Sequence, residues 1–383
     1  MTYSVHQHWD PLRVCIVGKS YPPEFYNYIT NSKIRSVLER IAIETEEDYQ
    51  QLIQLLKKFK VEVVRPNINL NQNFYKRHGK IEAPPMTPCD WSIMIGGTFY
   101  HNWRTEIQVY KDIAPTHWPN ISSMDEFLNL DQYIIDEVND VIEKETVLNS
   151  HDYKHILTDI SQHSNKIIER PWYNAGSILN RAMITRIGKD LYFGTESYDQ
   201  NQTPLKQQVE ELFPNYRCRI INTGGHSDGT FCPVVPGLIV SLYDIPTYAE
   251  TFPGWEVIYL PGQSWDRVKP FLELKQKNAG KWWVPGEELN DDFTSYVESW
   301  LDHWVGYVEE TVFDVNMLVI DEKNVVCNNY NEDVFKAFDR FGITPHVINF
   351  RHRYFWDGGL HCITSDIHRE GVQKDYFPER RLT

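Results

Sequence analysis

The sequence predicts an α/β protein in which one supersecondary unit is repeated about five times around a central pocket. Two observations indicate this fold class. The order strand, turn, strand, helix, strand returns along the chain, with some copies weaker than others. Polar residues also fall at the same point of several units, between the closing strand of one unit and the hairpin of the next. Such repeats bury one continuous core, and their arrangement in a ring can remove exposed sheet edges.

The first half of the chain contains two units, the second of which is interrupted by a long insertion. A strand is expected at 13–18. A helix should follow from 31–32 to about residue 60, because its apolar residues recur at helical spacing. An alternating strand at 61–66 ends at a proline. A hairpin with a glycine turn is expected at 91–100, and the strand that closes its unit near 166–169.

The second half repeats the same order three times. The expected hairpins lie at 183–193, 231–242 and 316–327, the helices at 204–212 and 331–341, and the closing strands at 217–221, 256–260 and 346–350. The whole chain, 1–383, is therefore predicted to form a single domain. The segments at about 101–165 and 262–306 are insertions on this plan.

Bulk composition excludes several classes of function. Hydrophobic residues make up 41% of the 383 residues, which is ample for a core. The net charge, 38 − 53 = −15, argues against nonspecific binding to nucleic acid or to an anionic membrane. No apolar stretch approaches the ~20 residues of a membrane span. The N-terminus has no basic start followed by an apolar run, so no signal peptide is expected.

The six cysteines are scattered and include no CxxC pair. Disulfide frameworks and structural zinc sites are therefore not expected, and a reducing, cytoplasmic setting fits the pattern. Cys362 stands out because it directly follows His361 and the glycine pair 358–359 near the C-terminus. Glycine lets a ligand approach the backbone closely. A thiol there is a nucleophile if its surroundings favour the thiolate, whereas the alternative is a small buried core cysteine.

Five polar residues occupy the junctions between the predicted units. They are Asp90, Asn174, His226, Asp228 and Cys362. Equivalent positions in a five-fold ring converge on its axis, so residues far apart in the chain would share one central pocket. Taken singly, each has a structural alternative, since an aspartate is often a turn or cap residue and a histidine is often a hydrogen-bonded core residue.

These landmarks resemble the amidinotransferases, the family that includes glycine amidinotransferase and inosamine-phosphate amidinotransferase. The segment His-Trp-Asp-Pro-Leu at 8–12 resembles the start of their first strand. Pro-Cys-Asp at 88–90 resembles their Pro-Arg-Asp, with Trp-Arg at 103–104 in the expected place after it. His-Ser-Asp-Gly-Thr-Phe at 226–231 resembles their His-x-Asp region, and Gly-Gly-Leu-His-Cys-Ile-Thr-Ser-Asp at 358–366 resembles their nucleophile motif. The matches cover nearly the whole chain in the family's order.

The resemblance implies a fold and a chemistry. The fold would be a five-bladed α/β-propeller of pseudo-symmetric ββαβ-type repeats around a central pocket. Cys362 would attack the guanidinium carbon of a donor, arginine in the known relatives, and would carry the amidino group to a primary amine. Asp90 and Asp228 would hold the planar cation through paired hydrogen bonds. His226 would protonate the departing amine and later deprotonate the incoming one.

The remaining expectations also follow from the resemblance. Asn174 would stand in the catalytic set, and Arg104, Asn316 and His361 would contact the substrates. No metal or organic cofactor would be needed. The partners would be a small guanidino donor and an amine acceptor, with a homodimer left open.

The chain departs from the family pattern at two places. Relatives carry an acidic residue where this chain has Asn174, so the negative charge that would orient the histidine is missing. The arginine that grips the donor's carboxylate in glycine amidinotransferase should fall where this chain has Ile245, and a nearby pair of serines is replaced by Glu309 and Glu310. Loss of a cation and gain of acids disfavour a carboxylate tail. One hypothesis is therefore a donor or acceptor different from arginine and glycine, bearing an amine instead of the carboxylate, which a comparison of arginine with agmatine would test. A misalignment beside the insertion is the other.

Three functions stay open on sequence alone. The first is an amidinotransferase. The second is a hydrolase of the same superfamily, in which water replaces the amine and ammonia or urea is released. The third is a noncatalytic protein that keeps the pocket for binding, which Asn174 favours.

Overall fold

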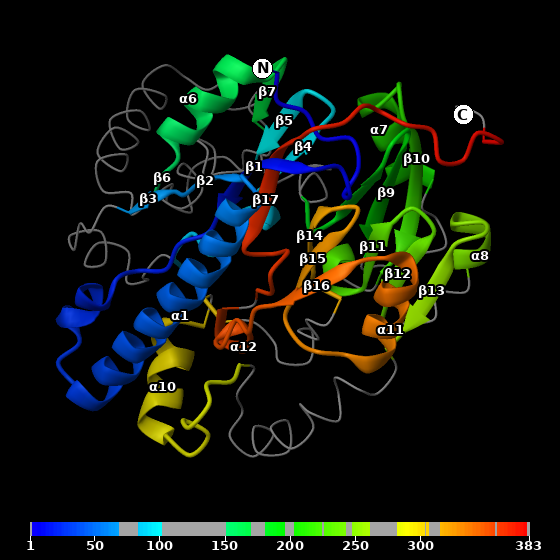
Figure 1. The fold of residues 1–383 in the computed structure, drawn as a ribbon. Helices are drawn as coiled ribbons and strands as arrows, with labels where there is room; N and C mark the ends of the chain where they lie inside the picture. The colour runs from blue at the N-terminus through cyan, green and yellow to red at the C-terminus, as the bar shows by residue number, and fades with distance from the viewer. Residues whose placement is uncertain are drawn as a thin grey trace, which may run out of the picture.

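The computed structural model describes residues 2–68, 83–101, 151–169, 181–195, 203–223, 226–242, 247–260, 282–302, 304–305, 315–356 and 358–380. These stretches contain helices and small open sheets, so the predicted α/β class is confirmed (Figure 1). Among the helices of these stretches, none has the length and apolar character needed to cross a membrane.

Five three-stranded sheets of one topology dominate the described part of the chain. In each of them two antiparallel strands form a pair, and a third strand runs parallel to the second. The repeated unit is thus confirmed, although each sheet is separate and none closes on itself among the described residues. The sheets are β4 (Ser92–Ile95), β5 (Thr98–His101) and β7 (Lys166–Glu169); β8 (Ile184–Ile187), β9 (Asp190–Thr195) and β10 (Arg217–Asn222); β11 (Phe231–Val235), β12 (Leu238–Ser241) and β13 (Glu256–Tyr259); β14 (Leu318–Asp321), β15 (Asn324–Cys327) and β16 (Thr344–Val347); and β17 (Thr364–Arg369), β1 (Leu12–Val17) and β2 (Glu62–Val64).

The last of these sheets joins the two ends of the chain. β1 pairs antiparallel with β17, with Cys15 opposite Asp366, and parallel with β2. The sequence pattern did not predict β17, because the first unit showed only one strand before its helix. β17 begins two residues after Cys362, so its pairing with β1 fixes the C-terminal end of the loop that contains Cys362.

One predicted strand is displaced. We expected the closing strand at 346–350, whereas β16 spans Thr344–Val347. Its partner β15 ends at Cys327, which pairs with Val347, and the last hydrogen bond between the two strands runs from the Ile348 N–H to the Cys327 carbonyl at 2.9 Å. The hairpins and the other closing strands lie within a few residues of the predicted ranges.

The long helix α1 (Ser32–Lys58) begins and ends as its sequence predicts. The side chain of Asn31 accepts a hydrogen bond from the backbone N–H of Lys33, which caps the first turn. Its buried residues recur every three or four positions and face the largest core cluster. The other helices of the described stretches are α6 (Lys154–His163), α7 (Thr203–Leu212), α8 (Tyr248–Thr251), α10 (Asp291–Trp300), α11 (Glu332–Phe341) and α12 (Arg353–Trp356), with 3₁₀ turns η1 (Pro23–Tyr28), η2 (Pro88–Asp90) and η4 (Ser227–Gly229).

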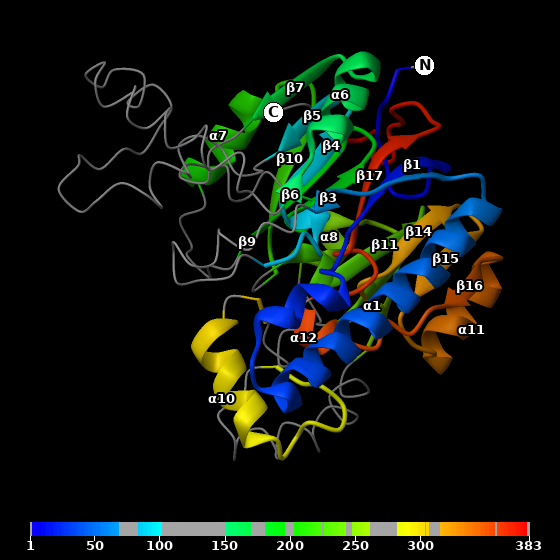
Figure 2. The same cartoon turned by 90° about the vertical axis from the view of Figure 1, so that its left-hand side faces the viewer.

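The described parts of both insertions pack on the core. In the first, α6 places Ile156 and Ile160 in a buried cluster with strand residues of β1 and β5, and the two-stranded sheet β3 (Asn67–Ile68) with β6 (His151–Asp152) lies beside it. In the second, α10 lies beside α1 (Figure 1, Figure 2). Its residues Phe293 and Val297 belong to the cluster that α1 faces. Both insertions therefore contribute to the folded core.

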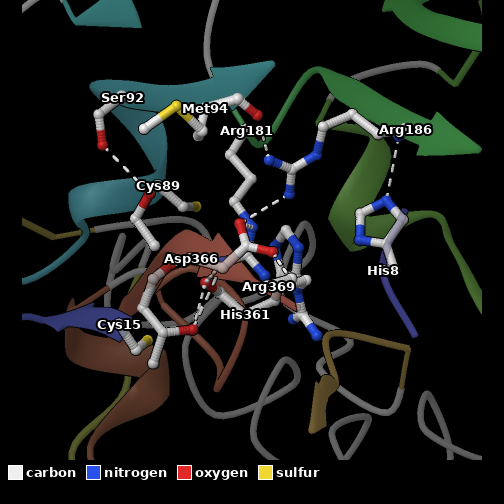
Figure 3. Close-up of polar contacts among 12 residues, drawn as sticks. His8, Cys15, Cys89, Ser92, Met94, Arg181, Arg186, His361, Asp366 and Arg369 are labelled. Carbon is white, nitrogen blue, oxygen red and sulfur yellow. Dashed lines mark hydrogen bonds and ion pairs between the residues drawn. The ribbon is translucent and has the colours of Figure 1, made fainter. Parts of the chain in front are cut away.

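A buried ion cluster lies where the sheets meet. The Asp366 carboxylate in β17 pairs with three guanidinium groups, those of Arg181, Arg186 and Arg369, at 3.0, 2.7 and 2.5 Å (Figure 3). All four side chains are almost completely buried. Burial alone would raise the pKa of Asp366, but the three arginines hold it well below its ordinary value.

The same arginines bond to backbone carbonyls of other sheets. Arg186 in β8 donates to the Met94 carbonyl in β4. Arg369 donates to the carbonyls of Asp10, before β1, and Val319, in β14, both at 2.8 Å. One ion cluster therefore fastens four of the five sheets together. The fifth sheet reaches the same place, because Phe231 and Cys232 of β11 line a cavity of about 20 Å³ with Arg181 and Val319.

Candidate active site

Cys362 lies in the turn that connects α12 to β17. The turn is closed by the backbone N–H of Ile363, which donates to the Gly359 carbonyl at 3.0 Å, and by the Thr364 hydroxyl, which donates to the Leu360 carbonyl at 2.8 Å. Only 6% of Cys362 is exposed. A side chain at position 358 would crowd Thr87, because a Cβ on Gly358 would lie 2.9 Å from the Thr87 Cγ2.

Asn316 fixes the cysteine from the opposite side. Its Oδ1 accepts hydrogen bonds from the backbone N–H groups of His361 at 2.8 Å and Cys362 at 3.2 Å. Its Nδ2 donates to the Cys362 sulfur at 3.0 Å and to the Asp228 carbonyl at 3.2 Å. Asn316, predicted as a substrate contact, thus bonds to both the backbone and the sulfur of Cys362.

Asp228 is held at the N-terminal end of β11 by contacts with the β8 hairpin. Its backbone N–H donates to the Ala182 carbonyl at 3.2 Å, and the neighbouring Ser227 hydroxyl donates to the Met183 carbonyl at 3.0 Å. The backbone approaches β9 so closely that a Cβ on Gly194 would lie 2.1 Å from the Ser227 hydroxyl. These contacts fix the turn η4 against the β8–β9 hairpin of the neighbouring sheet.

The Asp228 carboxylate reaches the sulfur of Cys362. Its Oδ2 lies 3.4 Å from the Cys362 Sγ and bonds with the His361 Nδ1 at 2.7 Å. Among the described residues, its other oxygen, Oδ1, has no hydrogen-bond partner although it is buried. A buried carboxylate oxygen without a donor is available to a ligand or a water molecule.

Asp90 and Cys89 enter from η2. The Cys89 sulfur lies 3.2 Å from the Asp90 Oδ1 and 3.6 Å from the Asp228 Oδ2, and its backbone N–H donates to the Cys362 carbonyl at 3.4 Å. Arg181 connects these loops, since its N–H donates to the Cys89 carbonyl at 2.9 Å and its guanidinium to the Thr364 carbonyl at 2.6 Å. The ion cluster therefore reaches directly into the candidate site.

His226 is the exposed neighbour of the buried residues Ser227 and Asp228, and it precedes η4. A proton on His226 lowers the pKa of both Asp90 and Asp228. Since only nearby charges have such an effect at a partly wet site, His226 and the two carboxylates belong to one electrostatic group.

The sulfur of Cys362 is protonated at neutral pH when no ligand is bound. A hydrogen bond with Cys89 lowers the pKa of Cys362. Burial and the charges of Asp228 and Asp90 outweigh that effect, so the pKa rises from the ordinary value of 9.0 to about 12. Burial together with the Asp228 charge also raises the pKa of Asp90, despite the opposing effect of His226. A cation between the two carboxylates would reverse the main electrostatic cause and favour the thiolate.

Two predicted residues are not placed. Asn174 and Arg104 lie outside the described residues, and so do Ile245, Glu309 and Glu310, the positions on which the donor hypothesis depends. The structure brings together the predicted residues Cys362, Asp228, Asn316 and His361, with Asp90 joined to them through Cys89. The charge of His226 lowers the pKa of Asp90 and Asp228. The predicted contact residue His361 bonds to Asp228 and is itself 6% exposed.

Sequence reasoning missed Arg181 and gave no role to Cys89. Arg181 lies next to the start of the β8 hairpin, where a lone arginine in a polar segment normally reads as a surface residue. The available signal was the position of Arg181 just before a predicted hairpin, because polar candidate residues had been assigned to such junctions between units.

The chain is similar to known proteins along nearly its full length. No family model matches it. Glycine amidinotransferase from Xenopus tropicalis is 22% identical over 409 residues, covering 97% of this chain and 84% of that protein. The Gallus gallus protein of the same name is 24% identical with the same coverage. The resemblance to the amidinotransferases is confirmed. An L-arginine:L-lysine amidinotransferase from Pseudomonas savastanoi pv. phaseolicola is 26% identical over 201 residues, 51% of this chain and 46% of its own.

Solved amidinotransferases share the fold. An amidinotransferase of the saxitoxin biosynthetic pathway from Microseira wollei superposes with a TM-score of 0.58 at 16% identity, covering 98% of this chain and 99% of its own. The inosamine-phosphate amidinotransferase from Streptomyces griseus gives the same TM-score at 17% identity, with the same coverage. The amidinotransferase likeness therefore extends from sequence to architecture.

Replacement of Asn316 by alanine is expected to destabilise the chain by about 1–3 kcal/mol, because two buried N–H groups lose their acceptor. Asn316→Asp should retain that acceptor but place a negative charge near the sulfur, so Cys362 should react more slowly with iodoacetamide at a given pH. Urea denaturation and alkylation rates measure these effects. Equal alkylation rates in Asn316→Asp and the native chain would contradict the assigned contact with Sγ.

Two buried histidines should make stability fall in mild acid. Burial lowers the pKa of His101 from 6.5 to about 4, and burial with the nearby Arg181 charge lowers that of His361 to about 4 against the effect of Asp228. Between these values the unfolded chain binds protons that the folded chain excludes, so stability is lost as pH falls. Each contributes about 1 kcal/mol per pH unit.

The test uses the histidine outside the site. Urea denaturation of His101→Gln between pH 6.5 and 4 should give a shallower loss of unfolding free energy than the native chain gives. Parallel curves for the two proteins would show that His101 is not held neutral by burial.

Proposed function

We propose that this chain is an amidinotransferase that moves an amidino group from a guanidino donor, arginine or a relative, to a primary amine through a covalent intermediate on Cys362. The observation that carries the proposal is the approach of the Asp228 carboxylate to within 3.4 Å of the Cys362 sulfur, with Asp90 and His226 in the same electrostatic group. The likeness to the glycine and arginine:lysine amidinotransferases supports it.

The donor binds first, through its charge. A planar guanidinium donates paired, charge-assisted hydrogen bonds to the carboxylates of Asp228 and Asp90, and the Asp228 Oδ1 is open for this purpose among the described residues. The bound cation offsets the negative charges that hold the Cys362 pKa near 12. The thiol therefore gives its proton to His226 once the donor is bound rather than before.

The thiolate of Cys362 then attacks the guanidinium carbon, and the bond from that carbon to the donor's substituted nitrogen breaks. The departing amine takes a proton from His226, and the amidino group remains on sulfur. The acceptor amine attacks the same carbon, gives its proton to His226, and releases the sulfur as thiolate. The Asn316 N–H, 3.0 Å from Sγ, stabilises the negative sulfur at both stages.

Other residues of the site act by position. Asn316 holds the loop of Cys362, and His361 holds the Asp228 carboxylate. These positioning roles replace the direct substrate contacts that we expected of both residues. Arg104 remains assigned to substrate binding and Asn174 to the orientation of the histidine. The mechanism requires no metal or organic cofactor.

The same proposal covers the architecture. The five sheets form a five-bladed α/β-propeller within a single domain, 1–383, whose hub is the cluster of Asp366 with three arginines. All six cysteines are free, which suits a reducing compartment such as the cytoplasm. A homodimer is compatible with this scheme.

Product analysis tests the proposal. The full chain is incubated with arginine or agmatine, with and without a trial amine such as glycine or lysine, and the products are separated by mass spectrometry. We expect a new guanidino compound and the deamidinated donor only when the amine is present. Ammonia or urea formed without the amine would identify a hydrolase, and no product from any pair would favour a binding protein. Clear preference for arginine would reject the agmatine hypothesis.

A further inference from the structure

Three metal-binding side chains meet at the candidate site. The sulfur atoms of Cys89 and Cys362 and a carboxylate oxygen of Asp228 all lie within 4.8 Å of one another, and all three residues are buried. They come from three separate segments, η2, η4 and the turn before β17. Two thiols and a carboxylate are ligands that zinc accepts in proteins.

The spacing of these atoms fits a tetrahedral ion. The Asp228 Oδ2 lies 3.6 Å from the Cys89 sulfur and 3.4 Å from the Cys362 sulfur. Zinc binds sulfur at about 2.3 Å and carboxylate oxygen at about 2.0–2.2 Å, so two such ligands of one tetrahedral ion lie about 3.5 Å apart. The side chains therefore need little movement to bind the ion.

The neighbouring groups support the same set. Asn316 donates an N–H to the Cys362 sulfur at 3.0 Å, a contact that stabilises a metal-bound thiolate. His361 bonds to the Asp228 carboxylate at 2.7 Å and orients it. Outer contacts of this kind fix ligand geometry and strengthen metal sites.

We propose that Cys89, Asp228 and Cys362 bind a thiophilic divalent cation, zinc, with the fourth position open. The site does not depend on amidino transfer, but it uses the sulfur that transfer needs, so zinc and a guanidinium donor exclude each other. Binding releases the thiol protons, and its affinity rises with pH. Cys89 has no part in the transfer steps, and the metal site gives its buried thiol a function.

The experiment measures zinc directly, without any guanidino compound. The demetallated full chain, kept reduced with a phosphine, competes with a chromogenic chelator for zinc, and cobalt is added separately as a spectroscopic probe. We expect one zinc per chain and the thiolate charge-transfer and tetrahedral d–d bands of bound cobalt. Cys89→Ser and Asp228→Asn should each weaken zinc binding by more than about 100-fold. Cys218→Ser, which removes a buried thiol from β10, should leave it unchanged.

A second readout identifies the sulfur involved. Bound zinc should protect Cys362 from alkylation, as peptide mapping reports, and Cys89→Ser should abolish that protection. Absence of zinc binding, or zinc binding unaffected by Cys89→Ser, overturns the proposal. Zinc binding without amidino transfer would leave this site standing and reject the proposed enzyme, whereas transfer without zinc binding would do the reverse.

Discussion

Asp366→Asn is expected to destabilise the protein by at least about 3 kcal/mol, the largest stability effect of any single polar replacement considered. The change removes the carboxylate that pairs with three buried guanidinium groups, those of Arg181, Arg186 and Arg369. Asparagine has nearly the volume of aspartate, so the effect comes from charge rather than from a cavity. Urea denaturation of the two proteins measures it.

A surface pair provides the matched control. Glu332 and Lys336 pair at 2.7 Å on an exposed face of α11, so Glu332→Gln should leave the denaturation midpoint nearly unchanged. If Asp366→Asn shifted the midpoint no more than this control, the cluster would not be the element that holds the sheets together.

Asp228→Asn is expected to lower kcat/KM for the guanidino donor by about 100-fold, because the variant keeps a similar shape but loses the charge that binds the cation. The same change should speed alkylation of Cys362 by iodoacetamide at a given pH, since the Asp228 charge raises the pKa of that thiol. Unfolding would also expose the buried Cys362 thiol and speed its alkylation, so both rates are compared on variants that urea denaturation shows to be folded.

Glu370→Gln serves as the control for this pair of measurements, because Glu370 is a surface carboxylate bonded to Arg13. It should change neither rate. Unchanged or slower alkylation in the folded Asp228→Asn variant would contradict the assigned electrostatic role.

Local patterns were sufficient to predict the repeated unit. The apolar residues of α1 recur at helical spacing, and the hairpins of β4 with β5 and β8 with β9 place glycines with positive φ, Gly96 and Gly188, in their turns. These features are set by residues close together in the chain. The candidate site could be assembled from sequence because its residues repeat at equivalent junctions of the units.

Contacts between distant segments could not be predicted in this way. β17 pairs with β1 from the other end of the chain, and nothing in either strand specifies its partner. Arg181 and Asp366 look like ordinary polar residues until the fold buries them together. The contact of Cys89 with Asp228 is likewise visible only when η2 and η4 meet.

The proposed covalent intermediate is tested most directly by the mass of the peptide that carries Cys362 after reaction with a donor alone. The full chain is mixed with arginine or agmatine without an acceptor, quenched in acid, and analysed as intact protein and as peptides. We expect the peptide that carries Cys362 to gain one amidino group. This gain should disappear when a competent amine is added, and it should be absent from Cys362→Ala. An amidino group on another residue, or turnover by Cys362→Ala, would contradict the proposed intermediate.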